Sequence, residues 1–298
     1  MDKKIIVRIS NELGNQMFMY ASCYGISKNL KRLLLIDNES AFLSRKNIST
    51  YGLNGFNISC NIASEECKFL GFQGYIKRKI LKIINFFLRK KIFFIEQKDS
   101  NKITKFNDKI YNLRLSKSVY LEGYFETEKY FKHIKENILQ EFIFLDAKKY
   151  EKSHFFDILN KKNSVSICLR QNRFIEGKYK NNKLNQIKSN QFKDEQINYI
   201  NRSIDYIKKN TINPSFYLWS NDLINLDMSM FNCKIIKVNH DNNFLSGIDK
   251  RLLDLYLISQ CNHHIVIPSS FNWWGAWLSQ KKIKLYVVLI IPFLLTLK

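Results

Sequence analysis

The chain has 298 residues, of which 45% are apolar, with three prolines and ten glycines. This length suits two domains of about 150 residues, and the composition excludes a fibrous or broadly disordered protein. The formal net charge of +22 indicates a polyanionic partner, such as an anionic membrane or a phosphate-rich substrate. The alternative is that the excess lysines lie on solvated surfaces and bind no partner. Arg-Gly and aromatic RNA-binding signatures are absent from the sequence, which argues against nucleic acid.

Apolar runs and helical spacing alternate along the chain. Runs typical of buried strands occur at residues 3–10, 32–37, 118–125, 163–170, 215–222, 233–239 and 263–270. Helical spacing occurs at residues 16–30, 126–142, 145–163, 197–210 and 250–261, and in a closing helix that contains three tryptophans. This alternation predicts an α/β fold of parallel sheets covered on both faces. We expect two Rossmann-like domains, residues 1–150 and 151–298, that face a ligand cleft at the carboxyl ends of their strands.

Two segments bear on membrane contact. Residues 75–95 mix Ile, Leu and Phe with Lys and Arg at helical spacing. This pattern predicts either a basic amphipathic helix that lies on an anionic bilayer or a helix that packs on its own domain with a solvated basic face. Residues 285–297 are apolar but too short to span a bilayer, and read as a buried strand plus tail or as an altered chain end.

The cysteines and the first residues bear on the compartment. The six cysteines show no CxxC pair and no metal-ligand spacing with the five histidines. The opening residues run straight into a strand, without a secretory signal. We expect a reduced, cytoplasmic protein that needs no metal, with possible peripheral contact to an anionic inner membrane.

Polar side chains follow several predicted strands, where a doubly wound sheet binds its ligands. Arg170 ends one strand, and Arg173 lies three residues on, so that an arginine clamp for a diphosphate is predicted there. Ser269 and Ser270 precede the closing helix, where they either hold a phosphate oxygen or simply cap the helix. The neighbouring tryptophans read as core packing rather than ligand contact.

Two further strand ends carry candidate residues. Ser220 and Asp222 end the run at 215–222, and the Asp222 carboxylate is expected either to accept hydrogen bonds from a guanine edge or a ribose hydroxyl or to cap the next helix. Near the N-terminus, Gly14 is expected to allow a tight turn, and Asn15 and Gln16 to supply amides where the next helix starts.

Taken together, these segments resemble the bacterial α-1,2-fucosyltransferases of glycosyltransferase family 11. The segments that carry the resemblance are "LGNQMFMYA", "LEGYFETEKYF", "FYLWSND" and "DLYLISQCNHHIVIPSSFNWWGAWL". The chain departs from the family pattern at two places. Asn11 and Glu12 replace a usual Gly-Gly, and "CLRQNR" replaces a usual His-x-Arg-Arg-x-Asp motif. Only Arg170 of that motif remains, and Arg173 is a candidate for the lost second positive charge.

The resemblance implies a fold of the GT-B type and inverting transfer of L-fucose from GDP-β-L-fucose to the 2-hydroxyl of a galactoside. It implies metal-free catalysis in bacterial surface polysaccharide synthesis (O-antigen or lipopolysaccharide), with a galactose-terminated or lipid-linked glycan as acceptor. The acceptor is expected on the first domain and the donor on the second. Arg170 is expected to contact the β-phosphate and to be catalytic, and the expected donor-binding residues are Gly14, Asn15, Gln16, Arg173, Ser220, Asp222, Asp254, Ser269 and Ser270.

Several readings stay open at this point. Asp254 either serves the nucleoside or has a helix-surface or capping role. Glu12 is a candidate acceptor-side base, and arginine assistance without a strong base is the other possibility. A transferase for another donor or linkage, or a non-catalytic GDP-sugar-binding relative, would fit the same residues.

Overall fold

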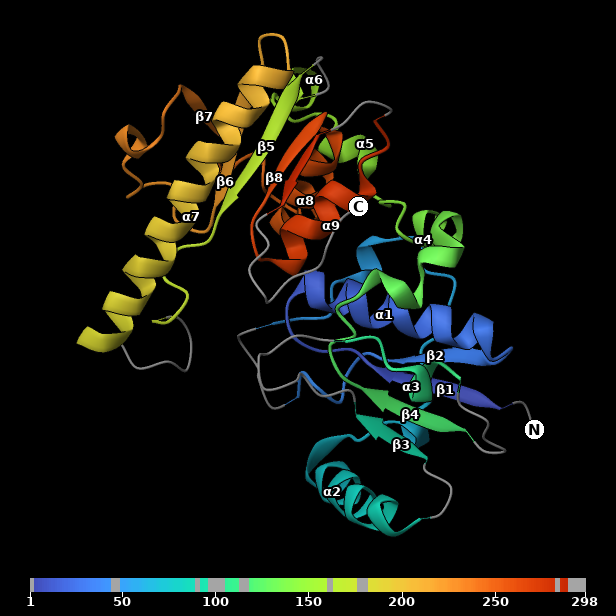
Figure 1. Ribbon diagram of the computed structural model, residues 1–298. Helices are drawn as coiled ribbons and strands as arrows, with labels where there is room; N and C mark the ends of the chain where they lie inside the picture. Colours follow the sequence, from blue (N-terminus) through green and yellow to red (C-terminus); the bar gives the residue numbers. More distant parts are fainter. Residues whose placement is uncertain are drawn as a thin grey trace. The chain divides into compact units, whose positions relative to one another are not determined.

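The computed structural model describes residues 3–43, 49–88, 92–95, 105–112, 118–159, 163–175, 182–281 and 285–288. The chain divides into two compact units, the first running to Leu145 and the second starting at Asp146. The boundary expected at residue 150 lies shortly after this division. Each unit contains one parallel sheet, as the alternation of strands and helices predicts (Figure 1).

The first unit is built on a four-stranded sheet with the order β2-β1-β4-β3. Its strands are β1 (Lys4–Arg8), β2 (Leu33–Asp37), β3 (Phe93–Ile95) and β4 (Val119–Glu122). Its helices are α1 (Leu13–Asn29), α2 (Gly71–Phe87), α3 (Asp108–Tyr111) and α4 (Lys135–Glu141). Short 3₁₀ turns lie at Leu53–Gly55, Glu65–Cys67, Glu128–Tyr130 and Lys132–Ile134.

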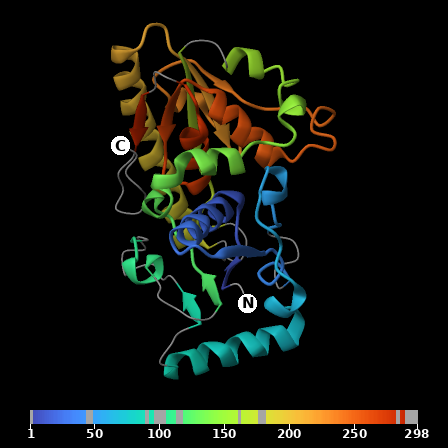
Figure 2. The same cartoon turned by 90° about the vertical axis from the view of Figure 1, so that its right-hand side faces the viewer.

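One row of side chains crosses this sheet and forms a core on one of its faces. Ile6 pairs in register with Leu35 and Tyr120, and Tyr120 pairs with Phe93. These four side chains are buried together with Ala63 and Phe69, and Leu81 of α2 packs against them. Helix α1 contacts β1 and β2, and α2 contacts β3. Both views show α2 running along the β3 edge of the sheet (Figures 1 and 2).

The second unit is built on a five-stranded sheet with the order β7-β6-β5-β8-β9. Its strands are β5 (Ser164–Leu169), β6 (Ser215–Ser220), β7 (Ile235–Lys237), β8 (His263–Val266) and β9 (Tyr286–Val288). Its helices are α5 (Ala147–Tyr150), α6 (Phe156–Leu159), α7 (Lys183–Asn210), α8 (Lys250–Gln260) and α9 (Ser270–Leu278), with a 3₁₀ turn at Met228–Met230. Right-handed crossovers place α7 on one face of the sheet and α8 and α9 on the other (Figure 1).

Close packing of α8 against α9 holds the closing helix in place. A Cβ atom added at Gly275 would lie 2.4 Å from Cγ2 of Ile258, so that only glycine allows this approach. Trp273, Trp274 and Trp277 are buried and contact one another, with ring centroids 5.0 to 6.1 Å apart. Core packing is therefore the role of these tryptophans, as predicted.

The structure corrects two of the predicted elements. The apolar-basic segment at 75–95 is not one helix, because α2 ends at Phe87 and residues Phe93–Ile95 form an edge strand of the first sheet. Helix α7 begins at Lys183, well before the predicted start at 197, because its polar first half is supported by an Asn182 cap that accepts from the Asn185 amide. Of the apolar C-terminal segment, β9 is confirmed as a strand, and residues 289–298 lie outside the described ranges.

Candidate active site

The order of the strands locates a ligand-binding edge in the second unit. From β5 the chain proceeds to β6 and β7 on one side, and later to β8 and β9 on the other. The switch point therefore lies between β5 and β8, and open α/β sheets bind ligands there, outside the carboxyl ends of the strands. Arg170 follows β5, and Ser269 and Ser270 follow β8. Since β5 and β8 pair in parallel, these residues leave neighbouring strands at the same edge.

The backbone of Arg170 is fixed by a buried amide of α7, while its side chain is exposed. The Arg170 amide donates to Oε1 of Gln196 over 3.1 Å, and Nε2 of Gln196 donates to the Arg170 carbonyl over 2.9 Å. Gln196 is 1% exposed, so this pair of bonds is shielded from water. The arrangement fixes the backbone from which the exposed Arg170 side chain extends at the switch point. The sequence analysis did not identify Gln196. A glutamine among the apolar residues on the buried face of α7 could have indicated a polar contact there.

A second set of amides joins the end of β5 to the end of β6. The Gln171 amide donates to Oδ1 of Asn221 over 2.8 Å, and Nδ2 of Asn221 donates to the Gln171 carbonyl over 3.1 Å. Nε2 of Gln171 donates to Oγ of Ser220 over 3.0 Å and also to the Asp222 carbonyl. Gln171, which stands where the resemblance implies a second arginine, is therefore buried and binds the neighbouring strand end. Ser220 is used in the same contact.

Arg173 and Asp222 lie on the two loops that leave these strands. The Arg173 guanidinium lies over the Phe192 ring, 5.0 Å from its centroid, after Asn172 has turned the chain with a φ of 59°. Asp222 accepts at Oδ1 from the amide and from Nδ2 of Asn225, over 3.3 and 3.1 Å. A turn follows β6, so Asp222 closes a turn and caps no helix.

The start of α9 is capped locally. Ser269 is extended, with a φ of −147°, and its Oγ accepts from the Asn272 amide over 3.5 Å. The buried Asn272 in turn accepts at Oδ1 from the Ile267 amide over 3.0 Å. Capping is thus the observed role of Ser269, and Ser270 begins the first turn. The partial positive charge of this helix terminus lies beside the Arg170 strand end.

Two groups lie beneath this edge. Burial raises the pKa of the Cys168 thiol to about 12, with Asn272 opposing the shift, so a neutral thiol stands where the resemblance implies a histidine. Burial also raises the pKa of Asp254, whose Oδ2 pairs with Lys250. Its buried Oδ1 lies near the Trp219 indole without a hydrogen bond of normal geometry. The Asp254 side chain is 15% exposed and pairs with Lys250 one turn earlier on the same helix. Asp249 caps α8 by accepting from the Arg251 amide, so capping is not the role of Asp254.

The loop before α1 differs from its predicted geometry. Asn11, with a φ of 64°, makes the turn, whereas Gly14 lies inside the first helical turn and is not among the residues with positive φ. The Asn15 and Gln16 amides donate to the Glu12 carbonyl. The buried Gln16 side chain donates to the carbonyls of Asn11 and Thr50, over 2.7 and 2.8 Å, and accepts from the Gly52 amide over 2.9 Å. The Gln16 side chain therefore joins two loops of the first unit.

Glu12 is exposed at the N-cap of α1 and makes no side-chain capping bond. It remains a candidate carboxylate on the first unit. The structure describes the two units separately, so Glu12, Gly14, Asn15 and Gln16 are placed on the first and Arg170, Arg173, Ser220, Asp222, Asp254, Ser269 and Ser270 on the second.

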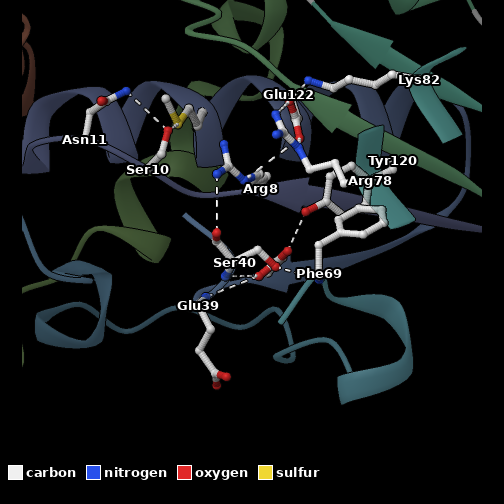
Figure 3. Close-up of polar contacts among 12 residues, drawn as sticks. Arg8, Ser10, Asn11, Glu39, Ser40, Phe69, Arg78, Lys82, Tyr120 and Glu122 are labelled. Atoms are coloured by element: carbon white, nitrogen blue, oxygen red, sulfur yellow. Dashed lines mark hydrogen bonds and ion pairs between the residues drawn. The ribbon is translucent and has the colours of Figure 1, made fainter. Parts of the chain in front are cut away.

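The first unit has a carboxyl edge of its own that the sequence reading missed. Its switch point lies between β1 and β4, which end at Arg8 and Glu122. The Glu122 side chain is 8% exposed and is paired with Arg78, with Nζ of Lys82 at 3.1 Å and with Nε of Arg8 at 3.9 Å (Figure 3). Burial alone would raise the pKa of Glu122, but the Arg78 bond and the three positive charges together lower it.

The neighbouring strand end is closed in a similar way. Asp37 ends β2, and its Oδ1 accepts from the amides of Glu39 and Ser40 over 3.2 and 2.9 Å. The Tyr120 hydroxyl donates to its other oxygen, and Arg8 donates to the Ser40 carbonyl over 3.3 Å (Figure 3). The sequence feature that could have identified this edge is a charged residue at the end of each apolar run, namely Arg8, Asp37 and Glu122.

Metal-binding clusters, membrane-spanning helices and disulfides are all absent from the described residues. No group of three or more His, Cys, Asp or Glu side chains in the described ranges is arranged to hold a metal ion. No helix of that part of the chain is long and apolar enough to cross a bilayer. All six cysteines lie within those ranges, and no disulfide links any two of them.

Comparison with known proteins decides the family. The family model described as glycosyl transferase family 11 matches residues 1–292. The chain belongs to glycosyl transferase family 11. It is 30% identical over 281 residues to an alpha-1,2-colitosyltransferase of Escherichia coli, covering 92% of this chain and 87% of that one. It is 26% identical over 296 residues to the O-antigen biosynthesis glycosyltransferase WbnK of Escherichia coli, covering 94% and 91%.

A solved structure supports the fold assignment. The chain superposes on the NodZ alpha-1,6-fucosyltransferase of Bradyrhizobium, in crystals soaked with GDP-fucose, with a TM-score of 0.53 over 93% of both chains and 13% identity. The two parallel-sheet units are those of the GT-B fold class. As a member of glycosyl transferase family 11, the chain is a glycosyltransferase, and its switch-point edge is where such chemistry is to be sought.

Proposed function

We propose that this glycosyltransferase transfers L-fucose from GDP-β-L-fucose to the 2-hydroxyl of a galactoside, with inversion, in the synthesis of a bacterial surface polysaccharide. The observation that carries the proposal is the exposed Arg170, held by Gln196 at the switch point of the second sheet. Membership of family 11 and the fold shared with a fucosyltransferase soaked with GDP-fucose support the donor class.

The chemistry requires that negative charge be stabilised as GDP leaves. The Arg170 guanidinium would pair with the diphosphate, and the amides at the start of α9 with the Ser270 hydroxyl would bind a phosphate oxygen. Gln196 fixes the Arg170 backbone, and this limits how far the strand end must move when the guanidinium pairs with the departing diphosphate. Asp222 and Asp254 are proposed for the nucleoside side of the donor.

The acceptor is assigned to the first unit. O-antigen synthesis by one relative supports a galactose-terminated or lipid-linked glycan as the acceptor. The exposed Glu12 carboxylate is the candidate base for the acceptor hydroxyl. The alternative is a loose transition state assisted by arginine without a strong base.

A second candidate function is colitosyl transfer, because a relative with 30% identity is an alpha-1,2-colitosyltransferase. Colitose is L-fucose without its 3-hydroxyl. Comparing the two donors therefore tests whether the site makes a hydrogen bond to that hydroxyl. A site that hydrogen-bonds this hydroxyl would reject the colitosyl donor strongly, whereas a site that lacks such a contact would not.

The test is incubation with GDP-fucose or GDP-colitose and a panel of β-galactosides, with linkage analysis of each product. We expect a fucosylated product with an α-1,2 bond, formed equally well in EDTA. Preferential use of GDP-colitose would shift the assignment to the second candidate. GDP binding without turnover of either donor would make the protein a non-catalytic relative, and a metal-reversible loss in EDTA would refute the metal-free mechanism.

A further inference from the structure

Helix α2 (Gly71–Phe87) turns its apolar side away from the protein. Of its 17 residues only Gly74 is buried. Large apolar side chains on this helix are strongly exposed: Phe72 by 77%, Ile83 by 64%, Phe86 by 78% and Phe87 by 79%. A surface helix of a globular protein normally shows the reverse pattern, with its apolar stripe facing the core.

The side of α2 that faces its own domain places Leu81 against the core of the first sheet, and its other contacts are made by small or polar residues. A Cβ atom on Gly74 would lie 2.3 Å from the backbone carbon of Phe69, so the helix approaches that loop through a glycine. Arg78 and Lys82 reach Glu122 at the end of β4. Asn85 donates to the Phe93 carbonyl over 2.7 Å and accepts from the Phe93 amide over 3.1 Å. These contacts fix the rotation of α2 about its own axis. Because Gly74, Arg78, Lys82 and Asn85 face the domain, the apolar stripe on the other side of the helix faces outward.

The stripe has the spacing of one continuous helical face. Phe72, Ile76, Ile80, Ile83 and Phe87 follow one another at intervals of three or four residues, and each is exposed. At 3.6 residues per turn, Lys77 and Lys79 fall on the two opposite borders of this stripe. Both lysines are exposed. An apolar face bordered by lysines is the pattern of a helix that lies in a membrane interface.

Charge selects the occupant of this face. Gly71–Phe87 contains Lys77, Arg78, Lys79 and Lys82 and no acidic residue. A second copy placed on the stripe would oppose two basic helices, which repel each other. Anionic lipid headgroups would attract the bordering lysines while the acyl boundary receives the phenylalanines and isoleucines.

We propose that α2 binds flat in the interface of a bilayer that contains anionic lipid. The proposal stands on α2 alone and does not depend on the donor or acceptor of the enzyme. It assigns the membrane-contacting surface to the first unit and to one face of one helix.

The test is co-sedimentation of the full chain with vesicles of phosphatidylglycerol and phosphatidylcholine, compared with vesicles of phosphatidylcholine alone. We expect binding to the anionic vesicles that weakens at high salt. The triple variant Phe72→Ser, Ile83→Ser, Phe87→Ser should bind at least about tenfold more weakly, because its exposed apolar area is removed. The pair Lys77→Gln, Lys79→Gln should lose about tenfold on anionic vesicles only.

The matched control is Ile212→Ser with Ile224→Ser, two isoleucines of the second unit that are 80% and 89% exposed. This control should bind vesicles as the unsubstituted chain does. Circular dichroism and turnover of a soluble acceptor should be unchanged in every variant, which separates a failure of this proposal from a failure of the enzymatic one. Equal vesicle binding by all variants would overturn the proposal. So would concentration-dependent dimerisation that the triple variant abolishes, since α2 would then bind a second copy.

Discussion

The carboxyl edges of the two sheets are built from different chemistry. In the first unit, charged side chains of β1, β4 and α2 converge on Glu122, with Arg8, Arg78 and Lys82 around one carboxylate. In the second unit, neutral amides hold the strand ends, with Gln196 on the Arg170 backbone and Asn221 on the Gln171 backbone. The Arg170 side chain itself is exposed.

The difference indicates separate tasks for the two edges. The Glu122 carboxylate is 8% exposed and is surrounded by cations, and it stabilises the edge to which α2 is attached. Removing this carboxylate would leave the positive charges around it without a partner in a largely buried place. Amides can position a loop without neutralising a nearby guanidinium, because they carry no net charge. The second edge is therefore suited to receive an anion, and the first to hold its elements together.

The largest effect is expected from Glu122→Ala. Three cations would lose their common partner, so the free energy of unfolding of the first unit should fall by about 3–5 kcal/mol. Urea unfolding followed by hydrogen exchange of first-unit peptides measures this change. The control is Asp146→Ala, whose partner Lys149 is 59% exposed, and which should cost less than about 1 kcal/mol. Comparable losses in the two variants would contradict the assignment of a structural role to the Glu122 cluster.

Arg170→Ala tests the second edge. Turnover should fall by about 10² or more, which corresponds to roughly 3 kcal/mol of transition-state stabilisation, because one preorganised donor to the leaving diphosphate is removed. Steady-state kinetics with the sugar nucleotide measures the loss. Arg202→Ala, an exposed arginine on α7, should retain normal turnover. A folded Arg170→Ala protein with near-normal turnover would remove Arg170 from the site.

Acid should weaken the second unit before the first. The pKa of His240 is lowered to about 4, mainly by burial and then by the Lys250 and His154 charges. The folded state therefore favours the neutral imidazole, and stability is lost as pH falls from the ordinary value of about 6.5 towards 4. The pKa of Glu122 is also lowered, so its contribution persists until pH falls below its ordinary value of about 4.3.

The four tryptophans all lie in the second unit, so their fluorescence during urea unfolding at several pH values reports on that unit. We expect a loss on the order of 2 kcal/mol between pH 6.5 and 4. His240→Phe should flatten this slope, because the ring packs against Phe155 and Phe244 and the variant cannot titrate. An unchanged slope in His240→Phe would assign the acid sensitivity to other groups.

The smallest effect is expected from Arg173→Ala. If Arg173 leaves the Phe192 ring to supply a second positive charge, its loss should weaken GDP binding by about fivefold, or roughly 1 kcal/mol. Calorimetric titration of GDP into the folded variant measures this change. An unchanged dissociation constant would confine Arg173 to its contact with Phe192 and leave Arg170 as the charged phosphate ligand of this motif.

The sequence determined the larger elements of the fold because apolar periodicity is a local property. The strands at residues 4–8, 33–37, 164–169 and 215–220 follow continuous apolar runs, and such runs bury themselves in a parallel sheet whatever their partners are. The placement of Arg170 and Ser269 at one edge follows from the same rule, since parallel strands end on the same side. The sequence predicts core packing for the tryptophans of α9, which cluster in a helix directly after a buried strand, and they are buried.

Only the tertiary structure decided which polar groups meet across long stretches of chain. Gln16 joins Thr50, Gln196 joins Arg170, and Arg78 joins Glu122, at separations of 34, 26 and 44 residues. No periodicity encodes such pairs, because each depends on where the strand order brings two loops together. The direction of the α2 stripe was open in the sequence for the same reason. Helical spacing shows that a helix has an apolar face, but Gly74, Arg78 and Asn85 choose the side that meets the protein, and they do so through partners on other elements.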